Sequence, residues 1–542
     1  MLTKLLRIAK HAPPHQSTSL TGGAATTHPM VGIVAVLLGA LTSVFTSRLL
    51  AVGLNDVAGA IGASSDSMTW VSTAYNASNM FIGPITVYLG GLLGARRVLL
   101  CSSVVFMLSE LFSPIVAHDF RLFVFLQAIA GLSAGTYYPL TMTLIVRHLP
   151  MKFLHLGIAA YALDILASTH IATALEGWYM VNLSWHWVFW NALLITPLLM
   201  ICLVIGIPKQ PLPQRNPKLS FWGFLYASLG VTALYIALDQ GERLDWLNSP
   251  VVVGLLAGFC ILTVATLVRH SRQPNPMVNL KFLATRNFLL LGAILVVFRF
   301  LLLSPTLLLP NFLALVQGYR PEQTGQALAW VAIPQLIAAP IAGLVLYRAD
   351  SRLVCGLGFA TVAFACLLES RITPNWNAET FIPSQLLLAI GLAFALTGLI
   401  TTIFRTALAL GALKSPINIL TISCWFQTCR LFGAEIGKSA MIRFLAIQNA
   451  NNYNTLAHYV DGGWLTDERI KSLVGTVLPG SSGLADAGAR SAIELGSALK
   501  LQIGILSLSN GFLFIALAAT FCMLLIGFMV YTPPLTPAKA SG

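Results

Sequence analysis

Charged residues are scarce in this chain. Only 9% of its 542 residues are Asp, Glu, Lys or Arg, whereas soluble domains carry about 25%. The eight cysteines form no CxxC or Cys/His spacing, which argues against a zinc or disulfide scaffold. The sequence also lacks a phosphate-binding loop, a serine-nucleophile elbow and an HExxH pattern. We therefore expect no ATP-driven or enzymatic chemistry, no cofactor and no metal.

The chain has long apolar runs instead, and 56% of its residues are hydrophobic. A helix needs about 20 apolar residues to cross about 30 Å of hydrocarbon. The predicted fold class is therefore an all-α polytopic membrane protein in the lipid bilayer. Fourteen transmembrane helices are predicted, at residues 31–53, 69–91, 97–117, 121–144, 155–177, 186–206, 220–239, 250–269, 287–309, 324–347, 352–370, 383–405, 418–445 and 507–531.

The formal net charge of +13 comes from 32 basic and 19 acidic residues. The basic residues sit singly or in pairs between apolar runs and form no stripe, which excludes a nucleic-acid partner. They gather in alternate loops, for example at Arg96, Arg97, Arg348 and Arg352. Cytoplasmic loops carry this excess of Lys and Arg. An even number of spans then places both termini in the cytoplasm.

Two blocks of the sequence resemble each other, residues 69–100 and 325–357. Each contains a span, a tight turn with Gly or Arg, and the start of another span. Such repeats are typical of transporters that bind substrate between two halves. The predicted organisation is a tail at 1–30, a six-helix half at 31–206, a linker with two inserted helices at 207–286, a six-helix half at 287–531 and a tail at 532–542.

A polar segment at 446–506 precedes the last span, on the predicted outer face. Its second half has apolar residues at helical spacing and predicts a helix that enters the membrane. Its first half, NANNYNTLAHYVDGGWLTDERIK, is equally consistent with a helix and with disorder.

Five stretches, in order along the spans, carry a family resemblance. They are SWHWVFWNALL (184–194), LDQGERLDWLNSP (238–250), NPMVNLKFLATRNF (275–288), NFLALVQGYRPEQTGQAL (311–328) and TCRLFGAEIGKS (428–439). With them the chain resembles the major facilitator superfamily, in its fourteen-span drug:proton antiporter branch of EmrB-like multidrug exporters. The resemblance implies proton-coupled efflux by alternating access in a bacterial inner membrane. It also implies a periplasmic membrane-fusion adaptor and an outer-membrane channel as partners.

The chain departs from this family at charged positions. Thr46 occupies the place of the family's first-span Asp, and Arg48 follows two residues later. Gly91 and Tyr347 stand where the cytoplasmic loops of the two halves usually carry Asp. Gln127 replaces an Arg in the fourth span. The remaining candidates for loops that control the conformational change are Gly94, Arg96, Arg97, Arg348 and Arg352.

The fifth span replaces the family's Gly/Pro motif. The matching positions are Ser168, Thr169, Ala172, Thr173, Glu176 and Gly177. Most of these residues are small, so close packing against a neighbouring helix is still expected. The prolines are absent, and the kink they would cause is not expected.

Ionisable residues inside the bilayer are costly and usually face a cavity or a partner. Asp164 is either a proton site that lines the pathway or an ion-pair partner of an arginine such as Arg48. Glu176 is interpreted mainly as a solvated residue at the outer end of its span, and His170 mainly as a structural hydrogen-bonding residue. Glu110 is a secondary protonation candidate. The proton-coupling candidates are Asp164, Glu176, Glu110 and His170.

Arg48 and Arg299 occupy corresponding positions in the first helix of each half. They either flank a central cavity or neutralise local acids. Glu435 and Lys438 are spaced to pair with each other. The substrate-cavity candidates are Arg48, Arg299, Tyr137, Tyr138, Trp330, Gln335 and Arg430.

The favoured hypothesis is a proton-coupled secondary exporter of amphipathic toxic small molecules. One rival is a transporter of a specific small organic anion, which the two arginines and the absent first-span Asp suggest. A second rival is a membrane sensor or scaffold that transports nothing, for which no signalling domain is evident.

Overall fold

The computed structural model describes residues 29–148, 151–207, 221–272, 280–414, 416–458, 463–477 and 484–531. These residues form helices and short turns, with no β-strand among them. The all-α prediction is therefore confirmed. The predicted tails, apart from residues 29 and 30, and most of the linker before residue 221 lie outside the described residues.

Every predicted span coincides with a helix or with a run of consecutive helices. The helices of the first half are α2 (Pro29–Ile61), α3 (Ser65–Leu93), α4 (Ala95–Phe112), α5 (Phe120–His148), α6 (Met151–Asn182) and α7 (Trp187–Gly206). The linker holds α8 (Phe221–Gly241), η1 (Trp246–Asn248), α9 (Pro250–Arg272) and α10 (Leu280–Leu283). The remainder is α11 (Arg286–Leu301), η2 (Ser304–Leu308), α12 (Leu309–Gln317), α13 (Pro321–Val345), α14 (Ser351–Glu369), α15 (Ile382–Ala409), η3 (Ala412–Lys414), α16 (Pro416–Ala457), α17 (Trp464–Val477) and α18 (Leu484–Gly527).

Eleven stretches of the described chain are long and apolar enough to cross a membrane. The protein is thus a multi-pass membrane protein. Helices α3, α4 and α16 are not among the eleven. Polar residues lower their hydropathy, as Arg430, Glu435 and Lys438 do in α16. The count of fourteen spans stays a prediction.

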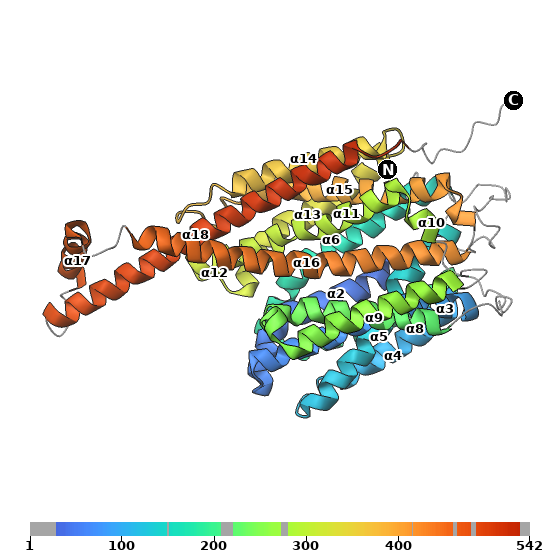
Figure 1. Ribbon diagram of the computed structural model, residues 1–542, viewed down its shortest axis with the longest axis horizontal. Coiled ribbons are helices and arrows are strands. Elements are labelled where there is room, and N and C mark those ends of the chain that lie inside the picture. The colour runs from blue at the N-terminus through green and yellow to red at the C-terminus, as the bar shows by residue number, and fades with distance from the viewer. Residues whose placement is uncertain are drawn as a thin grey trace.

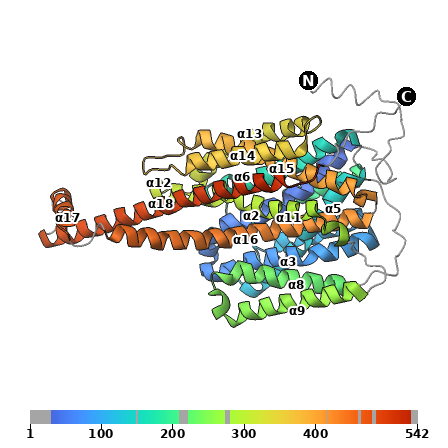
Figure 2. The same cartoon turned by 45° about the horizontal axis from the view of Figure 1, so that its top comes forward.

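The helices pack as two bundles that meet at few pairs of helices. Helices α2 to α5 and α7 contact mainly the first six helices, and α11, α12, α14, α15, α16 and α18 contact mainly the second group, whereas α6 and α13 make their most extensive contact with each other. Between the bundles, α6 packs on α13 and α15, and α16 packs on α3 and α5. The inserted helices α8 and α9 lie at one edge of the molecule, beside α3 (Figure 2). Since α8 also touches α16, it contacts both bundles.

The contact between α6 and α13 is very close, as the small residues of α6 predict. A Cβ atom added to Gly177 would lie 2.6 Å from the backbone of Glu322. A Cβ atom added to Gly325 would lie 2.4 Å from Cα of Ala174. Such distances leave no room for a side chain, so the two backbones touch directly.

The ninth predicted span is not one continuous helix, in contrast to the prediction for residues 287–309. Helix α11 ends at Leu301, a π-helical turn η2 covers Ser304–Leu308, and α12 follows. Pro305 and Pro310 lack the amide hydrogen that a regular helix needs, and this explains the break. The wider turn places Thr306 and Leu307 at the wall of a cavity.

Part of the polar segment 446–506 continues the neighbouring helices. Residues 446–457 are the last turns of α16, and residues 484–506 are the first turns of α18. Figure 1 shows these two helices projecting beyond the rest of the bundle, with α17 near their tip. Stacked rings of Phe444 and Phe514, 4.6 Å apart, and a 2.9 Å hydrogen bond from Asn452 Nδ2 to Ser507 Oγ hold the pair together. The described residues of the Asn-rich half are therefore mostly helical.

Candidate functional site

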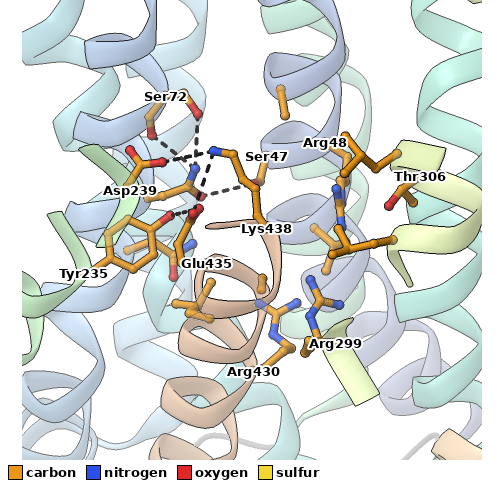
Figure 3. Close-up of a pocket in the computed structure, with 18 of the residues that line it drawn as sticks. Ser47, Arg48, Ser72, Tyr235, Asp239, Arg299, Thr306, Arg430, Glu435 and Lys438 are labelled. Atoms are coloured by element: carbon orange, nitrogen blue, oxygen red, sulfur yellow. Dashed lines mark hydrogen bonds and ion pairs between the residues drawn. The ribbon is translucent and has the colours of Figure 1, made fainter. Parts of the chain in front are cut away.

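A cavity of about 380 Å³ lies between helices of both bundles and the inserted helix α8. Helices α2 and α3 of the first bundle, the inserted helix α8, and α11, η2 and α16 of the second bundle surround it (Figure 3). The polar residues that line it are Ser43, Ser47, Arg48, Thr69, Ser72, Asn76, Asn79, Tyr235, Asp239, Arg299, Thr306, Arg430, Glu435 and Lys438.

Helices α3 and α16 close together beneath this cavity. Leu420 of α16 lies 3.3 Å from the position that a Cβ atom on Gly90 of α3 would take. Gln427 Nε2 donates a hydrogen bond to Asn79 Oδ1 at 3.0 Å, and Asn79 lines the cavity. The cavity therefore has a floor on the side of the C-terminal end of α3.

One side of the cavity holds a network of acids around a lysine. Lys438 Nζ lies 3.2 Å from Asp239 Oδ1 and 3.7 Å from Glu435 Oε2. The Tyr235 hydroxyl donates to Glu435 Oε1 at 2.9 Å. The predicted pairing of Glu435 with Lys438 is confirmed, but Lys438 is shared with Asp239.

Helix α8 is fixed at the cavity by hydrogen bonds to both bundles. Thr73 of α3 donates to Asp239, and Gln240 Nε2 donates to Thr73 Oγ1 at 2.5 Å. Ser439 Oγ of α16 donates to the carbonyl oxygen of Leu238 at 3.1 Å. Sequence reasoning missed Tyr235 and Asp239 as site residues. The one available signal for Asp239 was that it belongs to LDQGERLDWLNSP, one of the five stretches that carry the family resemblance.

The other side of the cavity is lined by three arginines, Arg48, Arg299 and Arg430. The Arg430 guanidinium lies over the ring of Tyr138, 3.8 Å from its centroid, and its Nε donates to Gln427 Oε1 at 3.2 Å. Within the described chain, none of the three arginines forms an ion pair. Arg48 is attracted electrostatically by Glu435 without a salt bridge, so both alternatives for Arg48, cavity lining and neutralisation of a local acid, have support in the structure.

Asp164 of α6 is buried and does not line this cavity. Its Oδ2 accepts no hydrogen bond from any described residue, and it forms no salt bridge with Arg48. It interacts electrostatically with Arg430 across the interface between the bundles. Asp164 therefore lies outside the lining of this cavity, and the arginine that acts on it is Arg430 and not Arg48. Its role as a proton site stays a prediction.

The other acid and histidine candidates are buried away from the cavity. Glu176 has no exposed surface and lies against Gly53 of α2, so the expectation of a solvated residue is wrong. Glu110 and His170 are also buried, and their polar side-chain atoms have no hydrogen-bond partner among the described residues. Helix packing, which sequence cannot show, buries all three.

Four predicted cavity residues do not line the cavity. Tyr138 supports Arg430 from outside it, and Tyr137 packs its ring on Phe106 at 5.7 Å. Gln335 is fully buried. Trp330 is 47% exposed on the outer surface of the bundle, where lipid would contact it.

A buried acid that the sequence reasoning did not single out lies in the second bundle. Glu369 Oε2 accepts from Ser304 Oγ at 2.7 Å, and its Oε1 accepts from Gln385 Nε2 at 2.5 Å. The sequence signal that could have identified Glu369 is that it is an acid at the end of an apolar run. The network ties α14 to α15 and to the π-helical turn η2.

The predicted conformational loops are fixed by backbone contacts. Gly94 joins α3 to α4 with a φ of 83°, which favours glycine, and Arg96 Nη2 donates to the Val204 carbonyl oxygen at 3.1 Å. Arg352 donates to the Met529 carbonyl oxygen at 2.9 Å and pairs with Asp350 at 2.9 Å. Arg97 also has a partner, and Arg348 is exposed.

Replacing Asp350 with Ala is expected to lower the free energy of unfolding by about 1 kcal/mol at neutral pH, because Asp350 caps the start of α14. Partial burial alone would raise the pKa of this carboxyl. Hydrogen bonds from Arg352 and its charge outweigh that effect and hold the pKa below its ordinary value of 3.8. The stabilisation is therefore complete above about pH 4 and is lost as the pH falls through the folded-state pKa. Thermal unfolding of both proteins at pH 7 and below pH 4 checks this, and an equal difference at both pH values would contradict it.

Comparisons with known proteins agree with this architecture. The family model described as Major Facilitator Superfamily matches residues 36–437. The chain is 26% identical to "Multidrug export protein EmrB" of Haemophilus influenzae over 84% of this chain and 86% of that protein. It is 26% identical to "Probable multidrug resistance protein EmrY" of Escherichia coli K12 over 72% and 73%. The solved proton:xylose symporter XylE superposes with a TM-score of 0.56 at 11% identity, covering 93% of this chain and 96% of that one.

Proposed function

This chain belongs to the major facilitator superfamily, and from that premise we propose that it is a proton-coupled exporter of amphipathic toxic small molecules. The observation that carries the proposal is the cavity of about 380 Å³ between the two bundles. A volume of this size accommodates a drug-sized molecule. Its walls come from both bundles, so rocking one bundle against the other would expose it to each side of the membrane in turn. The similarity to EmrB and EmrY, which are named for multidrug export and resistance, supports the same function.

Asp164 is the proposed proton-coupling residue. The first span has Thr46 where related exporters have Asp, so another carboxyl must take up the proton. Asp164 is buried, has one carboxylate oxygen without a hydrogen-bond partner among the described residues, and acts electrostatically on Arg430 at the cavity. Protonation of Asp164 would change the charge beside Arg430, and this couples the proton to the substrate site. Glu110, His170 and Glu176 are secondary candidates.

The proposed orientation follows from the basic loops. In this orientation the protein lies in a bacterial inner membrane, and both of its termini are in the cytoplasm. Two turns also face the cytoplasm, one with Gly94, Arg96 and Arg97 and the other with Arg348 and Arg352. The floor formed by α3 and α16 then faces the cytoplasm, and the cavity lies in the periplasmic half. The projecting parts of α16 and α18, with α17, form the proposed contact surface for a periplasmic adaptor and an outer-membrane channel.

Expression of this chain in a pump-deficient host is expected to lower the accumulation of amphipathic dyes and antibiotics. A protonophore should restore accumulation to the level of the empty-vector control, because it removes the driving force. Fluorescent-dye efflux with and without the protonophore measures both effects. Extrusion that continues unchanged without a proton gradient would contradict the coupling. Vectorial flux in proteoliposomes would reject a role as a sensor or scaffold that transports nothing.

A further inference from the structure

We propose that Arg48, Arg299 and Arg430 form a binding site for the ionised acidic group of the transported compound, so that amphipathic organic acids are the substrates of this chain. The inference rests on the proposed function in one respect only, because it takes the cavity to be the transport cavity.

The charge balance of the cavity carries the first step. Four cationic side chains line it, Arg48, Arg299, Arg430 and Lys438, against two acids, Asp239 and Glu435. The lining therefore has two more cations than acids. If Asp164, which acts on Arg430 from outside the lining, is counted as ionised, the cations still outnumber the acids by four to three. An excess of buried positive charge is costly without an anion.

The two acids are paired with Lys438, whereas none of the three arginines forms an ion pair with a described residue, although Glu435 acts electrostatically on Arg48 and Asp164 on Arg430. Lys438 lies 3.2 Å from Asp239 and 3.7 Å from Glu435, and it occupies the acidic side of the cavity. Arg299 is only 8% exposed, and its Nε and Nη1 have no hydrogen-bond partner among the described residues. Two buried guanidinium donors beside a cavity point to a ligand that supplies acceptors.

The arrangement of the arginines also favours an anion. Figure 3 shows the guanidinium groups of Arg299 and Arg430 side by side at the lower end of the cavity, with Arg48 above them. Arg299 is repelled electrostatically by both of the others. Arg430 is nevertheless held in place by the Tyr138 ring and by Gln427. A carboxylate or sulfonate among them would accept charge-assisted hydrogen bonds and offset the repulsion.

The rest of the lining suits an apolar body attached to the acid. Val44, Leu54, Leu303, Leu307, Leu431 and Ile442 contribute apolar side chains to the same cavity. An amphipathic acid can therefore place its charged group at the arginines and its hydrocarbon against these residues. An inorganic anion would leave the apolar part of the cavity unfilled.

Binding of three matched probes to the full chain in lipid nanodiscs tests the inference. The probes are 2-naphthoate, the neutral 2-naphthamide and the cationic 2-naphthylmethylammonium, which share one ring system. Isothermal titration calorimetry is expected to show 2-naphthoate binding at least about tenfold more tightly than the other two, as charge-assisted hydrogen bonds predict. Equal binding of the three probes, or a preference for the cation, overturns the inference without using any variant.

Substitutions then locate the preference. Arg299→Gln is expected to bind 2-naphthoate about tenfold more weakly than the wild type and to bind 2-naphthamide equally well. The affinity of Arg299→Lys for 2-naphthoate is expected to lie between those of Arg299→Gln and the wild type. Arg286→Gln is the matched control, because Arg286 begins the same helix and is exposed. If Arg299→Gln does not fold, Arg48→Gln carries the same test. Retention of the full acid preference in the folded variants overturns the inference. Failure of dye efflux alongside an intact acid preference would instead overturn the proposed function.

Discussion

Replacing Asp164 with Asn is expected to reduce proton-driven export at least about 100-fold. Asn has nearly the same shape as Asp but cannot bind and release a proton. Asp164 is buried, and one of its carboxylate oxygens has no hydrogen-bond partner in the part of the chain that the structure describes. Removal of its charge should therefore leave the unfolding temperature unchanged or raise it. Reconstituted protein with an imposed pH gradient measures the export.

The coupling role predicts a specific pattern in the other readouts. Substrate exchange at equal concentrations on both sides needs no net proton transfer, and the variant should retain it. Asp66→Asn is the matched control, because Asp66 is an exposed acid in the first turn of α3. Loss of exchange together with export would show that Asp164 has a structural role, and unchanged export would remove it from the mechanism.

Replacing Gly131 with Ala is expected to produce the largest loss of stability. A Cβ atom at this position of α5 would lie 2.0 Å from the carbonyl oxygen of Tyr75 in α3. The obstacle is backbone, so no side-chain rotation can relieve it and the two helices must separate. We expect a loss of about 3 kcal/mol or more, at the upper end of the range for overpacked cores. Thermal unfolding of detergent-purified protein, followed by size-exclusion chromatography, measures it.

Gly59→Ala provides the comparison for this effect. An added Cβ atom at Gly59 in α2 would meet no atom of the described residues within 4 Å. Alanine is favoured over glycine in a helix by about 0.5–1 kcal/mol, so this variant should unfold at the same temperature as the wild type or slightly higher. If Gly131→Ala unfolds at the same temperature as Gly59→Ala, the close packing of α3 on α5 is refuted. Because α3 carries Asn76 and Asn79 into the cavity, a partly folded Gly131→Ala protein should also bind substrate less tightly.

The helices were predictable because their signal is local. A run of about 20 apolar residues favours a spanning helix whatever lies beside it. The ends of α8, at Phe221 and Gly241, differ from the predicted 220–239 by only one or two residues. The break at η2 was missed because a proline inside an apolar run either kinks a helix or is accommodated, depending on its neighbours.

The site was predictable only in part. Arg48, Arg299 and Arg430 were selected because charges within apolar runs are costly, and all three line the cavity. Tyr137 and Gln335, uncharged residues that were predicted to line the substrate cavity, are buried elsewhere. Asp239, the last residue of the predicted span 220–239, was not selected, yet it faces Lys438 of a helix that begins 177 residues further along the chain.

By itself, the sequence determined the all-α membrane class, the position of the helices, the pairing of Glu435 with Lys438 and the resemblance to exporters. The first three depend on hydropathy, charge or spacing within one segment, and the resemblance depends on five segments that follow in order along the chain. Only the tertiary structure decided that α8 reaches the cavity, that Glu176 is buried and that three arginines share one wall without a described ion-pair partner. The physical reason is that the cost of a buried charge depends on what surrounds it, and those surroundings come from helices distant in the chain.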